Sequence, residues 1–236
     1  MRGFAAFLSW CALVAASLGG LSLAGCTWRR APVDPPAPVT LELLVFNDGF
    51  HSGFIVPYDR LGIRLDLPRA VRAPVSQARF VEVGFTEQGW ALWTDHSTGH
   101  VLSMLFRTSP GGVALRWLPT RERSAVDDAP RQVYRLPLTA QGEAAFRAAV
   151  LAWLDPTPRA LIPVDDPAFV LPGSTRRYWL WRNCHDFTAE VLAAVGLPVQ
   201  GSLVRTPSSF AVELERLFSA MEDFGLTRIE PGTWPR

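Results

Sequence analysis

The chain has 236 residues, of which 48% are hydrophobic, and this length and composition suit one domain with a substantial core. The formal net charge is only +1 at pH 7 and no polybasic run is visible, which argues against a nucleic-acid partner. Every basic residue is Arg, so the chain lacks the lysine amine that phosphate-binding P-loops, pyridoxal Schiff bases and Ser–Lys nucleophile pairs need.

The first 25 residues have the pattern of a secretory signal peptide. A single positive charge at Arg2 is followed by a long apolar run, and residues 23–26 read LAGC. This ending resembles the lipobox of bacterial lipoproteins, which implies cleavage before Cys26 and lipidation of that cysteine. Because residue 27 is Thr rather than Asp, the resemblance also implies sorting to the outer membrane of a Gram-negative cell, with the protein facing the periplasm. The alternatives are an uncleaved membrane anchor and an ordinary signal peptide.

Residues 26–39 are rich in proline and are predicted to be an extended tether between the membrane and a domain that spans residues 40–236. Cys11 would leave with the signal peptide and Cys26 would carry lipid, so Cys184 would have no disulfide partner within the chain. A lone thiol in an oxidising compartment is either buried and inert or retained for its reactivity.

Within the domain, hydrophobic patterns predict short strands and three main helices. Strands are expected at residues 41–46, 53–56, 80–85, 89–94, 113–118 and 132–136, with 89–94 as the hairpin mate of 80–85. Helices are expected from a Thr139 cap to residue 154, over residues 184–195, and from a Thr206 cap to residue 221. The proline-rich stretch 156–177 is predicted to be a surface loop.

Cys184 is a candidate nucleophile because it opens an expected helix. The N-terminus of a helix presents unpaired N–H groups and partial positive charge, which favour a thiolate and can stabilise an oxyanion. The candidate base is His51, at the entrance of the second expected strand, which would hold the thiol proton as an imidazolium. Glu82 projects from the third expected strand away from its apolar face, where a carboxylate could reach a histidine on a neighbouring strand.

These motifs resemble a known superfamily. Residues 51–53, of sequence HSG, are followed by aliphatic residues and are similar to the histidine strand of the NlpC-type branch of papain-like cysteine hydrolases and acyltransferases. Here the histidine precedes the cysteine helix, which is the order of the circularly permuted members, whose relatives include lecithin retinol acyltransferase. The motifs at residues 51–53, 82–85 and 183–198 also resemble an uncharacterised, sometimes urease-associated family of bacterial lipoprotein-like proteins.

The resemblance implies an α+β, papain-like fold of the circularly permuted NlpC type, in which an antiparallel sheet packs against the helix that carries Cys184. It implies that Cys184 is the nucleophile and that His51 is the general base and later the general acid. A third polar residue orients the histidine in such enzymes, and this chain offers Glu82 on the strand or, alternatively, Glu87 just beyond it.

The residues around the cysteine are the candidate substrate contacts. Trp181, Asn183 and His185 are predicted to bind substrate, with Trp181 as a wall of the approach to Cys184. The resembling family has small polar residues after the cysteine, whereas this chain has His185 and Asp186. This departure leaves open an altered pocket or an alternative base.

The expected function is thioester chemistry by a periplasmic cysteine hydrolase, a peptidase or amidase, or by an acyltransferase. Compartment and resemblance suggest peptide or amide bonds of peptidoglycan as the substrate, and a lipid or lipoprotein acyl group is the alternative. The alternative class of function is a catalytically silent module that binds the cell envelope. No cofactor is expected, and Gly99 together with the absence of a Glu after His96 favours a polar loop over a metal site at residues 95–100.

Overall fold

The computed structural model describes residues 37–62, 78–91, 99–100, 103, 106–118, 132–155, 169–179, 181–199, 206–221 and 227–229. The predicted signal peptide, Cys26 and most of the predicted tether lie outside these residues. Among the helices of the described ranges, none combines the length and the apolar character that crossing a membrane requires.

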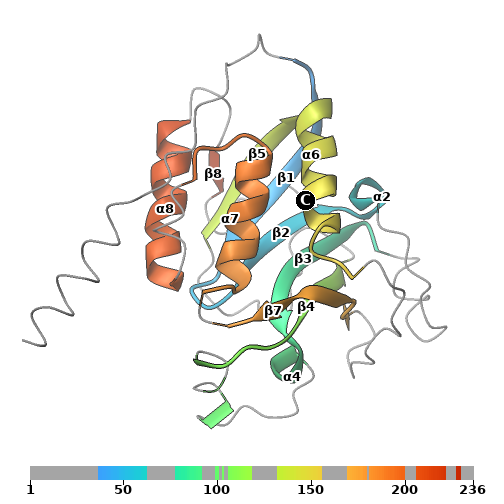
Figure 1. The fold of residues 1–236 in the computed structure, drawn as a ribbon. Helices are drawn as coiled ribbons and strands as arrows, with labels where there is room; N and C mark the ends of the chain where they lie inside the picture. The colour runs from blue at the N-terminus through green and yellow to red at the C-terminus, as the bar shows by residue number, and fades with distance from the viewer. Residues whose placement is uncertain are drawn as a thin grey trace, which may run out of the picture.

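An antiparallel sheet forms the centre of the fold (Figure 1). Its strands are β1 (Val39–Asn47), β2 (Ser52–Pro57), β3 (Phe80–Glu87), β4 (Ser109–Leu118), β5 (Gln132–Thr139), β6 (Phe169–Val170), β7 (Gly173–Tyr178) and β8 (Thr227–Ile229). The spatial order is β6-β4-β3-β2-β1-β5-β8, with β7 also paired to β4, and each of these pairings is antiparallel. An antiparallel sheet combined with separate helices is the α+β arrangement that the sequence predicts.

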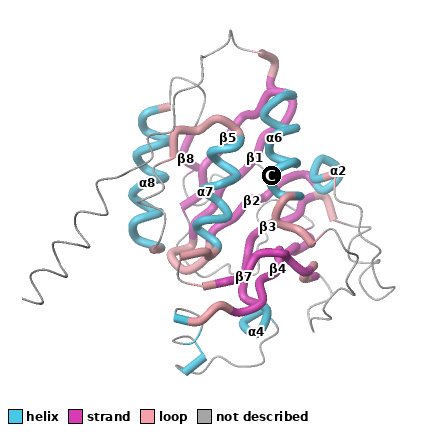
Figure 2. The backbone as a smooth tube through the Cα atoms, viewed as in Figure 1, coloured by secondary structure: helices cyan, strands magenta, loops and turns pink. Residues whose placement is uncertain are grey.

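Three helices lie on one face of the sheet, as the tube in Figure 2 shows. They are α6 (Ala140–Leu151), α7 (Cys184–Ala194) and α8 (Pro207–Ala220); two single-turn helices, α2 (Tyr58–Leu61) and α4 (Gln88–Ala91), follow β2 and β3. The ring of Phe54 in β2 packs edge-on against Phe146 of α6 and Phe187 of α7, with centroids 5.4 and 5.9 Å apart. These contacts fix the Cys-bearing helix against the middle of the sheet.

Alternate side chains along the strands point toward the three helices and form the hydrophobic core on that face of the sheet. In β3, Val81, Val83 and Phe85 are fully buried in the main hydrophobic cluster, so Glu82 and Gly84 project from the other face. Complete burial of a side chain of this size contributes about 1.5–3 kcal/mol relative to its exposed state. The burial pattern therefore determines the register, and the register determines which β3 positions lie beside the hairpin of β1 and β2.

The main helices and most strands match their predicted positions, and two predictions are wrong. The hairpin mate expected at 89–94 is not formed in its described part, because residues 88–91 are the helical turn α4 and β3 pairs with β4 instead. The Glu87 carboxylate accepts the Trp90 N–H at 2.6 Å, which turns the chain into that helix. The loop expected at 156–177 contains β6 and most of β7, while residues 156–168 lie outside the described residues.

Candidate active site

Cys184 is the first residue of α7, and a complete capping box holds it there. The Asn183 side chain accepts the N–H groups of His185 and Asp186 at 2.8 and 3.4 Å, and the Asp186 carboxylate accepts the Asn183 N–H at 3.0 Å. The Phe187 N–H donates to the Asn183 carbonyl at 3.1 Å. In the described part of the chain the Cys184 N–H has no acceptor, so this amide can serve an oxyanion.

His51 lies in the turn between β1 and β2, and the Asp48 carboxylate fixes that turn. One oxygen of Asp48 accepts the N–H groups of Phe50 and His51 at 2.9 and 2.5 Å, while the Asp48 N–H donates to the His51 carbonyl at 3.0 Å. Gly49, at φ 86°, occupies the left-handed position that such a turn needs. The turn between β1 and β2 lies beside the start of α7 (Figure 1), and the His51 ring is within hydrogen-bonding reach of Cys184.

The imidazole of His51 lies directly over Gly84 of β3. A Cβ atom at position 84 would lie 2.5 Å from Nε2 and 2.9 Å from Cε1 of the ring, closer than van der Waals contact allows. The ring also contacts Phe46 at a centroid distance of 5.9 Å. The absence of a side chain at Gly84 thus leaves the space that the His51 ring occupies, on the same strand that carries Glu82.

The buried Cys184 thiol lies between two imidazoles. Burial raises the pKa of Cys184, but His185 and His51 outweigh it and hold the pKa well below its ordinary value, through the positive charge that each ring has when protonated and through hydrogen bonds from both rings. Burial likewise lowers the pKa of His51, and the charge and hydrogen bond of Cys184 outweigh it, so the pKa of His51 is raised. Both shifts favour a thiolate–imidazolium pair.

The two candidate third residues have different partners. Glu82, which pairs with Ile55 and Arg116 across the sheet, is one of the charges that raise the pKa of His51, after the larger contribution of Cys184. Glu87 is buried and accepts the ring Nε2 of His100 at 3.1 Å as well as the Trp90 N–H. Of the two carboxylates, the structure brings Glu82 to His51 and engages Glu87 with α4 and His100.

The three residues predicted to bind substrate differ in how far they are exposed to solvent. Trp181 is 48% exposed and three positions before the thiol, where a substrate can reach it. Asn183 is buried and its side chain is engaged in the helix cap. His185 is 2% exposed, and its ring packs on Phe210 of α8 with centroids 5.1 Å apart. The structure therefore gives Asn183 and His185 partners within the protein.

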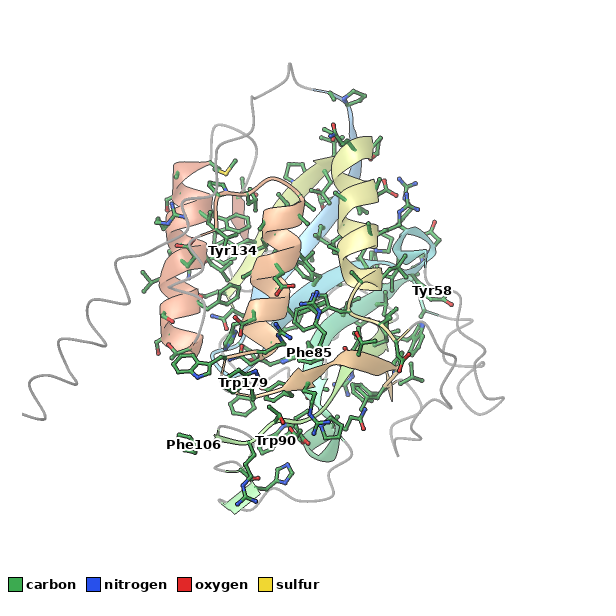
Figure 3. The ribbon with its side chains drawn as sticks, viewed as in Figure 1. Tyr58, Phe85, Trp90, Phe106, Tyr134 and Trp179 are labelled. Atoms are coloured by element: carbon green, nitrogen blue, oxygen red, sulfur yellow. The ribbon has the colours of Figure 1, made fainter. Side chains whose placement is uncertain are left out.

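Sequence reasoning missed Tyr178, the last residue of β7. Its hydroxyl lies within hydrogen-bonding reach of Cys184, and burial, followed by the charges of Cys184, Glu87 and Asp186, raises its pKa well above the ordinary value. The ring stacks on Phe85, which Figure 3 labels, with centroids 5.6 Å apart. The predicted loop ended at residue 177, one position before Tyr178, and no strand was predicted there, whereas pairing of β7 with β4 positions the residue.

The predicted polar loop at residues 95–100 is described only at its last two residues. There His100 pairs with Glu87, as above. Across the described ranges, no group of three or more His, Cys, Asp or Glu side chains is placed to hold a metal ion.

Together, the described residues at this end of the molecule can support acyl transfer. Cys184 supplies a nucleophile of lowered pKa, His51 a proton carrier, and the Cys184 amide and Tyr178 hydroxyl supply hydrogen-bond donors. Comparison of the chain with models of known protein families, with curated proteins and with solved structures finds no match.

Proposed function

We propose that this protein is a cysteine hydrolase or acyltransferase that works through a thioester. The observation that carries the proposal is the position of the Cys184 thiol, at the first residue of α7 and within hydrogen-bonding reach of the imidazoles of His51 and His185. A structural cysteine needs neither an ionised sulfur nor a neighbouring proton carrier. Both are costly to bury, and their presence in one place favours a reactive role.

The chemistry follows from these groups. The Cys184 sulfur attacks a carbonyl carbon, and the Cys184 N–H donates to the oxyanion that forms. The His51 imidazolium then gives its proton to the leaving amine, which departs as the thioester forms. Neutral His51 next removes a proton from water, or from an acceptor amine or hydroxyl, as it attacks the thioester and releases the thiolate. Glu82 stabilises the charged form of the imidazole during the first step.

The fold we propose is the circularly permuted, papain-like domain of the NlpC type. Three features support it: the histidine precedes the cysteine in the chain, the cysteine begins a helix, and that helix packs on an antiparallel sheet. The motif resemblance supplies the name of the superfamily.

For the substrate we propose peptide or amide bonds of peptidoglycan, with a lipid or lipoprotein acyl group as the alternative. The lipobox-like residues 23–26 support a protein that is tethered by lipid at Cys26 and faces the periplasm, where peptidoglycan lies. Phe50 is 61% exposed and its carbonyl lies 3.9 Å from the Cys184 sulfur, and Trp181, three positions before Cys184, is 48% exposed, so both rings offer apolar surface to a substrate. A catalytically silent envelope-binding module is the alternative class, and it predicts no turnover.

The first test measures how the alkylation rate of Cys184 by iodoacetamide depends on pH, in a variant of the full chain with Cys11→Ser and Cys26→Ser. Because the folded pKa of the thiol is depressed, the thiolate should appear as pH rises through a value well below the ordinary pKa of about 8.5. His51→Ala removes one of the stabilising charges, so the alkylation rate at pH 6 should fall about tenfold. A thiol that reacts only near its ordinary pKa, with or without His51, would contradict the proposal.

The second test measures turnover with purified peptidoglycan, following the release of soluble peptides by mass spectrometry. Because His51 is protonated until pH rises through its raised pKa, activity should be highest between the thiol pKa and the imidazole pKa, giving a bell-shaped profile. Cys184→Ala should abolish release. A reactive thiol without release from peptidoglycan, and without transfer from a lipid acyl donor, would favour the silent module.

A further inference from the structure

A continuous chain of buried side chains runs from the second imidazole back to the cysteine itself. The ring Nδ1 of His185 lies 2.9 Å from the Ser52 hydroxyl, which lies 3.0 Å from the Thr188 hydroxyl. The Thr188 hydroxyl donates to the Cys184 carbonyl at 2.9 Å. All three side chains are almost completely buried, Ser52 and Thr188 at 0% and His185 at 2% exposure.

Counting hydrogens along this chain determines which atom donates in each contact. A carbonyl can only accept, so the single hydroxyl hydrogen of Thr188 is used on Cys184. The contact between Thr188 and Ser52 must then use the only hydroxyl hydrogen of Ser52. Ser52 has none left for His185, so the third contact forms only if Nδ1 of His185 carries a hydrogen and donates it.

The same nitrogen faces the nucleophile. Nδ1 of His185 lies 3.9 Å from the Cys184 sulfur, within the reach of a weak hydrogen bond to sulfur. A nitrogen that already carries a hydrogen has no lone pair with which to accept the thiol proton. Its one hydrogen is directed at Ser52, and it reaches the sulfur as the longer branch of a three-centre hydrogen bond. His185 therefore differs in kind from His51 although both rings lie beside the thiol.

We infer that His185 is a positioning residue whose Nδ1–H is fixed by the Ser52–Thr188–Cys184 chain and faces the sulfur, so that His51 alone accepts the thiol proton. The inference rests on the proposed role of Cys184 as nucleophile. It departs from the sequence expectation for His185, which was substrate binding or an alternative base.

The surroundings of the two rings support this division. His51 faces the Cys184 thiol and the charges of Glu82 and Asp48, which favour its protonated form. The partners of His185 are the Ser52 hydroxyl, the sulfur and the ring of Phe210, which packs on it at 5.1 Å from α8.

Other charged groups also lie around the sulfur. Tyr178 of β7 reaches it, and the charges of Glu87 and Asp186 act on that tyrosine. None of these three residues is a member of the Ser52–Thr188–Cys184 chain, so a change within that chain tests His185 without removing them.

The most direct test reads the tautomer in the unaltered protein. Long-range ¹H–¹⁵N correlation spectra of ¹⁵N-histidine-labelled protein should show His185 protonated at Nδ1 at neutral pH, whereas His51 should become protonated at both nitrogens as the pH falls. A neutral His185 that carries its hydrogen on Nε2 would overturn the inference. This measurement needs no substitution and no turnover.

A second test changes Thr188, whose hydroxyl bonds the Ser52 hydroxyl and the Cys184 carbonyl. Thr188→Val removes the hydroxyl that accepts from Ser52, which leaves Nδ1 of His185 as the acceptor for the Ser52 hydrogen. The tautomer should switch to Nε2–H, and the alkylation rate of Cys184 at pH 6 should fall about tenfold with the loss of one hydrogen bond to a charged group. An unchanged tautomer and rate in folded Thr188→Val would overturn the inference.

A third test uses a matched pair at the histidine itself. The side-chain amide of His185→Asn keeps an N–H near the place of Nδ1 but cannot take a proton, whereas His185→Leu removes the donor. The Leu variant should alkylate at pH 6 about tenfold more slowly than the Asn variant. Equal rates in the two folded variants would contradict a donor role. Because alkylation needs no substrate, failure both to cleave peptidoglycan and to transfer a lipid acyl group would contradict the proposed function, whereas this inference requires only a reactive Cys184 thiol.

Discussion

At the scale of single residues, absence of a side chain matters as much as presence. Gly84 has no conformational reason to be glycine, since it lies in a regular strand, but its missing Cβ is the space that the His51 ring occupies. Both the histidine and the cysteine were predictable, because each belongs to a short motif with a chemical meaning. Tyr178 was not predictable, because its role depends on the pairing of β7 with β4 and not on its neighbours in sequence.

Gly84→Ala should displace the imidazole while leaving the sheet intact. The new methyl group would lie 2.5 Å from Nε2, so the ring must move and the thiol loses a stabilising charge. We expect the alkylation rate of Cys184 at pH 6 to fall about tenfold. Gly142→Ala is the control, because its Cβ would lie 3.4 Å from the nearest atom and alanine favours a helix by up to about 1 kcal/mol. A Gly84→Ala protein with unaltered thiol reactivity would show that His51 does not need this space.

Glu82→Gln and Glu87→Gln separate the two candidate third residues. Glu82→Gln removes a charge that raises the pKa of His51, so the alkaline limb of the activity profile should move to lower pH. Glu87→Gln alters the pair with His100 and should leave that limb in place. The measurement is the pH dependence of turnover in each variant. A shift caused by Glu87→Gln alone would assign the role to Glu87.

At the scale of elements, two helices share one kind of cap but differ in what the cap supports. The capping box of α7 fixes the residue after it, which is the thiol, whereas the capping box of α8, made by Thr206 and Ser209, serves the helix only. Helix boundaries of this kind were predictable from sequence because caps and the Gly196 stop are local signals. The short strand β7 was not, since its sequence GSTRRY has no apolar alternation and pairing with β4 alone makes it a strand.

Asn183→Ala and Thr206→Ala compare those two caps. Each substitution removes a capping side chain and should lower the free energy of unfolding by about 1 kcal/mol, measured by chemical denaturation. Asn183→Ala should also slow the alkylation of Cys184 at pH 6, because the first turn of α7 frays and the thiol moves from its partners. Thr206→Ala should leave the alkylation rate of Cys184 unchanged. Equal thiol reactivity in the two variants would mean that the cap of α7 has no part in preparing the nucleophile.

At the scale of the whole molecule, the main hydrophobic cluster joins the described sheet to α6, α7 and α8. The α+β class was predictable because strands of alternating pattern and capped helices follow each other in clear order. The pairing of β3 with β4, in place of residues 89–94, was not predictable. It depends on a strand more distant in the sequence, whose backbone completes the hydrogen bonds of β3.

The proposed lipid tether gives a prediction for the full chain. Cys26→Ser should move the protein from the membrane fraction to the soluble fraction of cells, because the acyl chains that hold it would be missing. Cys11→Ser, within the predicted signal peptide, should leave it in the membrane fraction. Immunoblots of fractionated cells make the measurement. A Cys26→Ser protein that still sediments with membranes would contradict lipidation at this residue.

The great sequence separation within the site has a consequence for how the protein acquires its reactivity. Ser52 and His185 touch although 133 positions separate them, and His51 belongs to a hairpin completed long before α7 in the chain. Contacts of such range form slowly and late in folding. We therefore expect a nascent chain to carry a thiol of ordinary pKa until its last third has docked, so that the lowered pKa of Cys184 and completion of the native fold arrive together.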